Sequence, residues 1–182
     1  MTLTLLIWLA TFLPAGASGL PNEVSAWPLF NSPVGQFSIR LPAAPAVNED
    51  DASVEYSVGD PSEFRYWVRH IPLPPDVQSV PKRDLLGAFT PTTDTLFGSD
   101  FVIALRESVP GTLHGLPTMT VHIQGSVPGR PDFTLQVCIV HRGTSLLAVG
   151  YSARSELYRR RLFPALLRTL SFKPSPSRTP PA

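Results

Sequence analysis

Five side chains of the types that bind metal ions or act as nucleophiles lie between residues 70 and 141 of this 182-residue chain: His70, His114, His122, Cys138 and His141. No two of the histidines have the close spacing of a metal motif such as H-E-x-x-H. His122 falls opposite the apolar face of its predicted strand, whereas His141 continues the apolar face of the next one. The sequence therefore predicts histidines of a sheet surface and no metal site.

A thiol nucleophile is the next chemistry to test, because Cys138 stands three residues before His141. Residues three apart in a strand point to opposite faces, and a reactive thiol needs an electropositive, partly exposed setting. Cys138 lies mid-strand between apolar neighbours, so we predict that it is buried. No serine has a G-x-S-x-G setting, and the acidic run Glu49–Asp51 lacks EF-hand spacing and is expected to be a solvated loop. The sequence thus predicts no catalytic residue and a protein that is not an enzyme.

Two groups of basic residues are candidate partner-binding sites. The first lies on a predicted C-terminal helix that also carries Arg154 and Arg168, and its members are Arg159, Arg160 and Arg161. They form either a solvated helix face or a contact for anionic lipid head groups or an acidic partner. The second group is Trp67 with the flanking Arg65 and Arg69 on one face of a predicted strand. Trp67 is either an exposed contact residue or part of a second core layer under a helix.

The elements that position these residues are mostly short strands with alternating polarity. We predict strands over residues 36–41, 53–58, 63–71, 101–109, 118–124, 133–141 and 145–151, with the second and third forming a hairpin. Residues 20–33 are expected to form an irregular lead-in. We expect Pro110-Gly111 to end the strand over residues 101–109, and residues 128–132 to form a turn. Alternation of this kind is typical of an antiparallel β-sheet covered by helices, an α+β fold.

Two helices are predicted. Residues 82–89 place apolar side chains on one stripe, with Phe89 as its last member. The second helix begins at Ser155 as its N-cap and has apolar residues four apart as far as Leu170. Pro164 lies inside this pattern and is expected to kink or restart the helix.

Composition restricts the classes of function. Hydrophobic residues make up 43% of the chain and charged residues 16%, which suits one domain with a real core. A net charge of +1 provides no global field that would attract nucleic acid or an acidic membrane. The single cysteine allows no internal disulfide, which fits a bacterial periplasm or cell surface better than a disulfide-rich secreted scaffold.

The N-terminus has the layout of a secretory signal peptide. An apolar run over Thr2–Leu13 is followed by Pro14 and a string of small residues, so residues 1–19 are predicted to be removed on export. The run is shorter than the roughly 20 residues of a membrane span, and no second long apolar segment follows. No Lys or Arg precedes Arg40, which departs from the usual pattern, and a buried N-terminal element is the alternative. Residues 20–172 are predicted to form one domain and the Pro-rich residues 173–182 a disordered tail.

The order of motifs resembles that of the PsbP-like superfamily, which includes the photosystem II extrinsic subunit and a nuclear-transport relative that binds a small GTPase. The likeness spans Trp27 to Phe172: a strand Phe-Ser-Ile-Arg-Leu-Pro-x-x-Pro (Phe37 to Pro45), a variable helical region, a β-meander, and a close in LRTLSF (Leu167 to Phe172). The resemblance implies an α/β/α sandwich around an antiparallel sheet. It also implies protein or ligand binding more than catalysis, and it assigns no functional residue here. Nothing in the chain points to photosynthesis.

Taken together, the sequence favours an exported, non-enzymatic domain of the periplasm or extracellular space that binds a protein partner or small ligand. Two alternatives stay open: an enzyme whose site is assembled from scattered residues, and an accessory structural subunit of an envelope complex. The sequence indicates no cofactor, no metal and no nucleic-acid partner. A weak contact with an anionic surface is a further expectation from the arginines.

Overall fold

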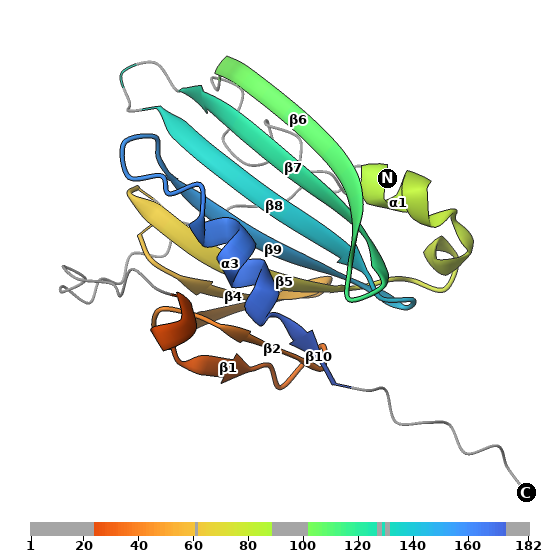
Figure 1. Cartoon of the computed structure of the whole chain (residues 1–182). Helices are drawn as coiled ribbons and strands as arrows, with labels where there is room; N and C mark the ends of the chain where they lie inside the picture. Colours follow the sequence, from red (N-terminus) through yellow and green to blue (C-terminus); the bar gives the residue numbers. More distant parts are fainter. Residues whose placement is uncertain (1–23, 61, 89–101, 127–128, 130–131, 174–182) are drawn as a thin grey trace, which may run out of the picture.

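The computed structural model describes residues 24–60, 62–88, 102–126, 129 and 132–173, which form two antiparallel sheets and short helices (Figure 1). The main sheet has the strand order β3 (Ala46–Asp50), β4 (Ser53–Val58), β5 (Phe64–Pro72), β9 (Ser145–Arg154), β8 (Phe133–His141), β7 (Leu116–Ser126) and β6 (Val102–Leu113). The small sheet has the order β1 (Leu29–Asn31), β2 (Phe37–Arg40) and β10 (Ser171–Phe172). The helices are η1 (Val24–Ala26), η2 (Val77–Ser79), α1 (Lys82–Ala88) and α3 (Leu162–Thr169).

The two-residue period of the strands divides the core between the two faces of the main sheet. On β5, Tyr66 and Val68 point to what we name the first face, and Trp67 points to the second face, as the alternation predicts. The pairing of β4 with β5 confirms the predicted hairpin, with Tyr56 opposite Val68.

The first face is covered by α3, η1 and the small sheet (Figure 1). Trp27 and Phe163, buried to 1% and 2% exposure, anchor this cover against the sheet. The Trp27 ring meets Tyr66 edge-on at 5.1 Å, and Tyr66 stacks on Tyr151 at 4.8 Å. Buried aromatic side chains contribute most of the area in such a core, so these contacts fix how the N-terminal segment lies on the sheet.

The second face is covered by α1, which contacts β7 and β8. Leu85 and Leu86 are the buried residues of this helix and pack against Val121, Ile123 and Val137. The helix predicted over residues 82–89 is thus confirmed, although Phe89 lies outside the described residues.

The predicted α+β class with an antiparallel sheet is confirmed, but the sheets dominate the molecule more than a helix-covered sandwich implies. The helix on each face has only seven or eight residues. Much of the first-face cover is the small sheet, which pairs strands from both ends of the described chain.

Two strand predictions were wrong at the edges of the main sheet. Residues 46–50, expected to be loop up to the acidic run, form β3 and pair with β4 from Ala46↔Ser57 to Asp50↔Ser53. Strand β6 does not close at Pro110-Gly111 but continues to Leu113. Charged residues and a proline without an N–H suit edge strands, so edge position explains both departures.

The predicted C-terminal helix begins six residues later than expected, with its N-cap at residue 161 instead of residue 155. Ser155 is not its N-cap, since the chain turns here and the Ser155 amide donates to the Asp132 carbonyl at 2.8 Å. The helix starts at Leu162 with Arg161 as N-cap residue, so Pro164 stands in the first turn and requires no kink. Beyond it, Ser171 and Phe172 form strand β10.

Several predictions lie outside the described residues: the leader 1–19, the start of the lead-in, Phe101, most of the 128–132 turn and the tail beyond residue 173. Within the described ranges the lead-in is not irregular, because it holds η1 and β1. No helix in these ranges is long and apolar enough to cross a membrane.

Candidate functional site

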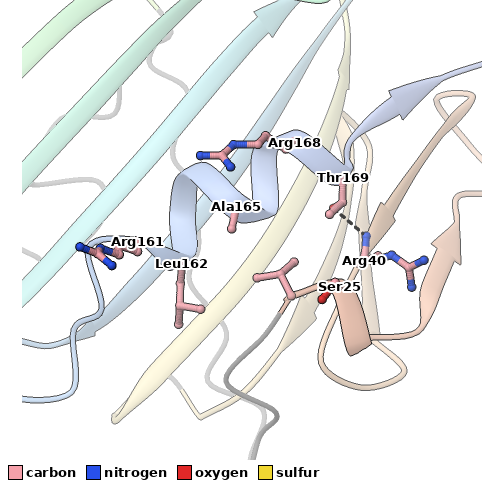
Figure 2. Close-up of a pocket in the computed structure, with 8 residues that line it drawn as sticks. Ser25, Arg40, Arg161, Leu162, Ala165, Arg168 and Thr169 are labelled. Carbon is pink, nitrogen blue, oxygen red and sulfur yellow. Dashed lines mark hydrogen bonds between the residues drawn. The ribbon is translucent and has the colours of Figure 1, made fainter.

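A shallow groove of about 440 Å³ runs between α3 and the segment formed by η1 and β2 (Figure 2). Its lining combines arginine, hydroxyl and apolar side chains: Arg40, Arg161, Arg168, Ser25, Thr169, Val24, Leu162 and Ala165. Figure 2 shows Leu162 and Ala165 projecting from α3 toward η1, with Arg161 and Arg168 at opposite ends of the helix. The groove therefore has an apolar floor and a basic rim.

Helix α3 presents this rim because its other side is fixed in the core. Phe163 and Leu166 are buried to 2% and 0% exposure on the first face. Arg161 and Arg168 are seven residues apart, which is close to two helical turns, so both lie along one side of the helix and remain exposed.

Arg40 reaches the groove from β2 and is held by both neighbours. Its guanidinium donates to the Trp27 carbonyl, and its backbone N–H donates to Thr169 Oγ1 at 3.1 Å. The Thr169 hydroxyl in turn donates to the Leu166 carbonyl at 2.8 Å. These bonds connect the end of α3 to β2 and fix where the third arginine stands.

The groove is electrostatically one-sided. No acidic residue is among its lining residues, and the two ion pairs within the described ranges lie elsewhere on the molecule. Arg161 and Arg168 thus have no carboxylate partner in the part of the chain that the structure describes. The N-terminus of α3, which carries a partial positive charge, adds to the same field. Chemically, this surface suits carboxylate or phosphate groups attached to an apolar segment.

The predicted basic group divides in the structure. Arg161 lines the groove, and Arg160 lines an adjoining hollow on the outer side of α3 that also shares Arg161 and Arg168. Arg159 is bound toward the sheet, where its backbone N–H donates to the Tyr151 hydroxyl at 3.3 Å. All three arginines precede α3, rather than forming a face of a longer helix.

The sequence hypothesis missed two members of the basic rim. Arg168 was assigned to the helix but not to the site, although its seven-residue spacing from Arg161 was visible in the sequence. Arg40 carried no such signal, because only the pairing of the small sheet brings residue 40 beside residue 169.

The second predicted group, Trp67 with Arg65 and Arg69, lies on the second face, on the opposite side of the main sheet. Arg65 pairs with Glu55, and Arg69 pairs with Asp50 at 2.7 Å. The Trp67 ring is half-buried and packs against the second core, as the alternative interpretation proposed. The structure therefore does not bring the two predicted groups together.

The histidines and the cysteine gather at no common point. Cys138 is buried at 2% exposure, and burial raises the pKa of its thiol. His122 faces the first side and His141 the second, as the alternation predicts, and burial lowers the pKa of both imidazoles. Among the described residues, no group of three or more potential ligands could hold a metal ion.

A row of neutral polar groups crosses the first face beside α3. In the strand register, His122 of β7 lies opposite Gln136 of β8, and Gln136 lies opposite Tyr151 of β9. The Tyr158 ring stacks on the rings of His122 and Tyr151, with centroid distances of 6.2 Å and 5.4 Å. Burial raises the pKa of Tyr158 to about 12, and its hydroxyl is therefore uncharged at neutral pH. The stacking contacts of Tyr158 hold the segment before α3 against the sheet. The charged groups beside α3 are therefore the arginines.

Comparison with known proteins finds no protein-family model and no curated protein that matches the chain. Solved structures do match. Cyanobacterial PsbP from Synechocystis sp. PCC 6803 is 12% identical over 88% of this chain and 99% of its own, with a TM-score of 0.58. A protein from Bacteroides thetaiotaomicron is 11% identical over 81% of this chain, with a TM-score of 0.53. The chain spans about half of that second protein, 49% of its length.

A third structure, of a protein of unknown function from Pseudomonas aeruginosa, is 12% identical over 81% of this chain and 98% of its own, with a TM-score of 0.48. At these identities the first two likenesses show the fold. The chain has a PsbP-like fold, which confirms the resemblance drawn from its motifs.

Proposed function

We propose that this protein is an exported, non-catalytic binding module whose groove beside α3 holds an acidic segment of another protein in the cell envelope. The observation that carries the proposal is the basic rim over an apolar floor, with Arg40, Arg161 and Arg168 among the residues that line one groove and no carboxylate among them.

The size and shape of the groove favour a segment over a small molecule. A ligand pocket normally encloses most of its ligand, whereas this hollow is open along the helix and continues past Ala165 into the hollow lined by Arg160. An extended chain with alternating carboxylates and apolar side chains would place its charges on the rim and its apolar groups against Leu162 and Ala165. Guanidinium–carboxylate pairs are among the stronger charged hydrogen bonds, which supports arginine as the recognising residue.

The binding test uses the purified full chain and a fluorescein-labelled peptide of alternating Asp and Leu, followed by fluorescence anisotropy. We expect binding that weakens as salt is added, since exposed charges are screened. The double variant Arg161→Glu/Arg168→Glu should weaken binding at least about tenfold, a loss of about 1.4 kcal/mol.

The matched control is Lys82→Glu/Arg83→Glu, which makes the same charge change on the exposed residues 82 and 83 of α1, on the second face. Equal loss of binding in this control would mean that net charge alone acts, and the groove would not be the site. Absence of binding to the acidic peptide at low salt would also contradict the proposal.

Export rests on the predicted leader and has its own test. The full gene, expressed in a Gram-negative host with a C-terminal tag, should yield periplasmic protein whose N-terminus begins near residue 18 or 20. Cytoplasmic protein that retains Met1 would contradict export without affecting the groove.

A further inference from the structure

Strand β3, at one edge of the main sheet, presents an acidic segment in an extended conformation. The strand is exposed at every residue. Val47, which is 61% exposed, and Glu49 are two residues apart, so both side chains lie on the same side of the strand. Asp51 follows in the turn to β4 and is also exposed. One apolar side chain and two carboxylates therefore occur within five residues of this edge.

Asp50 holds this segment in place and leaves the other two carboxylates free. Its Oδ1 accepts the Ala52 N–H at 2.9 Å, and its Oδ2 pairs with Arg69 at 2.7 Å. The ion pairs formed within the described ranges include neither Glu49 nor Asp51. A segment that is already ordered loses less conformational freedom on binding than a flexible peptide does.

The groove beside α3 has the complementary composition, with arginines on its rim and Leu162 and Ala165 on its floor. The β3 edge of the same molecule does not fill it, because no residue of β3 lines the groove or the adjoining hollow. Pairing with β4 along its whole length also keeps β3 in the main sheet. The β3 edge can therefore reach a groove only on another copy of the chain.

We propose that the groove of one copy of this protein binds the β3 edge of a second copy, so that copies associate head to tail. This inference rests on the proposed function and names the partner that the groove binds. Glu49 and Asp51 would meet the arginines of the rim, and Val47 would lie against the apolar floor. Since the two surfaces differ, each added copy leaves one of each open, and the assembly grows into chains or closes into a ring.

The other edge of the main sheet is a poorer match for the groove. Strand β6 has exposed apolar residues, but it carries a single carboxylate, Glu107, next to the basic side chain of Arg106. Pro110 also lies within this strand and lacks an N–H group. Charge complementarity therefore favours β3 as the edge that the groove binds.

The test is sedimentation equilibrium of the full chain from about 10 μM to about 1 mM at low salt. We expect the average mass to rise above that of the monomer, with a dissociation constant of about 100 μM for so small an interface. Added salt should return the chain to the monomer, since exposed charges are screened. The variants Glu49→Gln/Asp51→Asn and Arg161→Gln/Arg168→Gln each neutralise one surface and should weaken association at least about tenfold.

An equimolar mixture of these two variants makes the test specific to a head-to-tail contact. One variant keeps the groove and the other keeps the β3 edge, so the mixture should form 1:1 pairs and nothing larger. The matched control, Asp76→Asn/Asp84→Asn, neutralises two exposed carboxylates in and before α1 and should associate as the unaltered chain does. Every sample keeps the same residues 1–23, and circular dichroism checks that each variant is folded.

The outcomes separate this proposal from the function on which it rests. A chain that stays monomeric at about 1 mM but binds the Asp–Leu peptide would overturn the self-association and leave the groove as an acidic-segment site. A chain that neither associates nor binds the peptide would overturn both proposals. Association that persists in either neutral variant, or a mixture that forms no 1:1 pairs, would mean that other surfaces make the contact and would overturn the self-association.

Discussion

Replacing Gly150 with alanine tests how the sheet accommodates Trp67. The added Cβ would lie 2.1–2.5 Å from three indole atoms, where ordinary contact begins near 3.4 Å. The ring must therefore move by about 1 Å and lose contact with the second core, and strain of this kind costs about 1–3 kcal/mol. We expect urea unfolding to show this loss, together with a red-shifted Trp67 emission.

A matched glycine gives the opposite expectation. Gly87 lies in α1, and a Cβ there meets nothing within 4 Å, so Gly87→Ala should stabilise the chain by up to about 1 kcal/mol. The clash itself is isolated by repeating Gly150→Ala in a Trp67→Ala background, where the methyl group has room and should cost under about 0.5 kcal/mol. The reasoning is refuted if Gly150→Ala leaves both stability and emission unchanged, or costs the same in both backgrounds.

Three other predictions address protonation, reactivity and the last helix. Burial lowers the pKa of His122 and His141, so the unfolded chain binds protons more strongly than the folded chain. We therefore expect the free energy of unfolding to fall as the pH drops from about 7 to about 5. Urea unfolding midpoints measured across that range would show this fall, and midpoints that do not change with pH would contradict it. Ellman's reagent should label Cys138 only after unfolding, and rapid labelling of the folded chain would show that the thiol is accessible. Pro164→Ala should change the free energy of unfolding by less than about 1 kcal/mol, because Pro164 stands in the first turn of α3. Leu166→Ala, which removes a buried side chain from the same helix, should lower it by about 2–5 kcal/mol. A stabilisation near 3 kcal/mol by Pro164→Ala would instead place the proline in a helix interior.

The central strands were predictable because apolar side chains recur at every second residue or follow one another without a break, patterns that are visible in the chain. The predicted strand 133–141 coincides with β8, and the hairpin around Gly59 pairs as expected. The edges were not predictable by the same rule. Strand β3 is exposed at every residue and has no buried pattern to detect, and the predicted strand 101–109 missed only the end of β6, which continues through Pro110 to Leu113.

The candidate site was predictable only where its residues are close in sequence. Arg160 and Arg161 stood out as a basic run, but the run alone did not show where α3 begins. That start depends on tertiary contacts, such as the turn that binds Ser155 to Asp132. Arg40 could not have been found, because its place beside Thr169 depends on strand pairing across most of the chain.

That strand pairing has a consequence for the order in which the protein assembles. The small sheet joins β2 to β10 through a hydrogen bond between Ser38 and Ser171, 133 residues apart, and Lys173 donates to the Gln36 carbonyl. Closing a loop of that length costs about 4 kcal/mol in chain entropy, so contacts of this kind form late. A nascent chain that has not yet released its last strand can complete much of the main sheet but cannot fix Arg40 beside α3. The groove therefore forms late in folding, after β10 has paired with β2, and partly folded chains that already hold the main sheet would lack it.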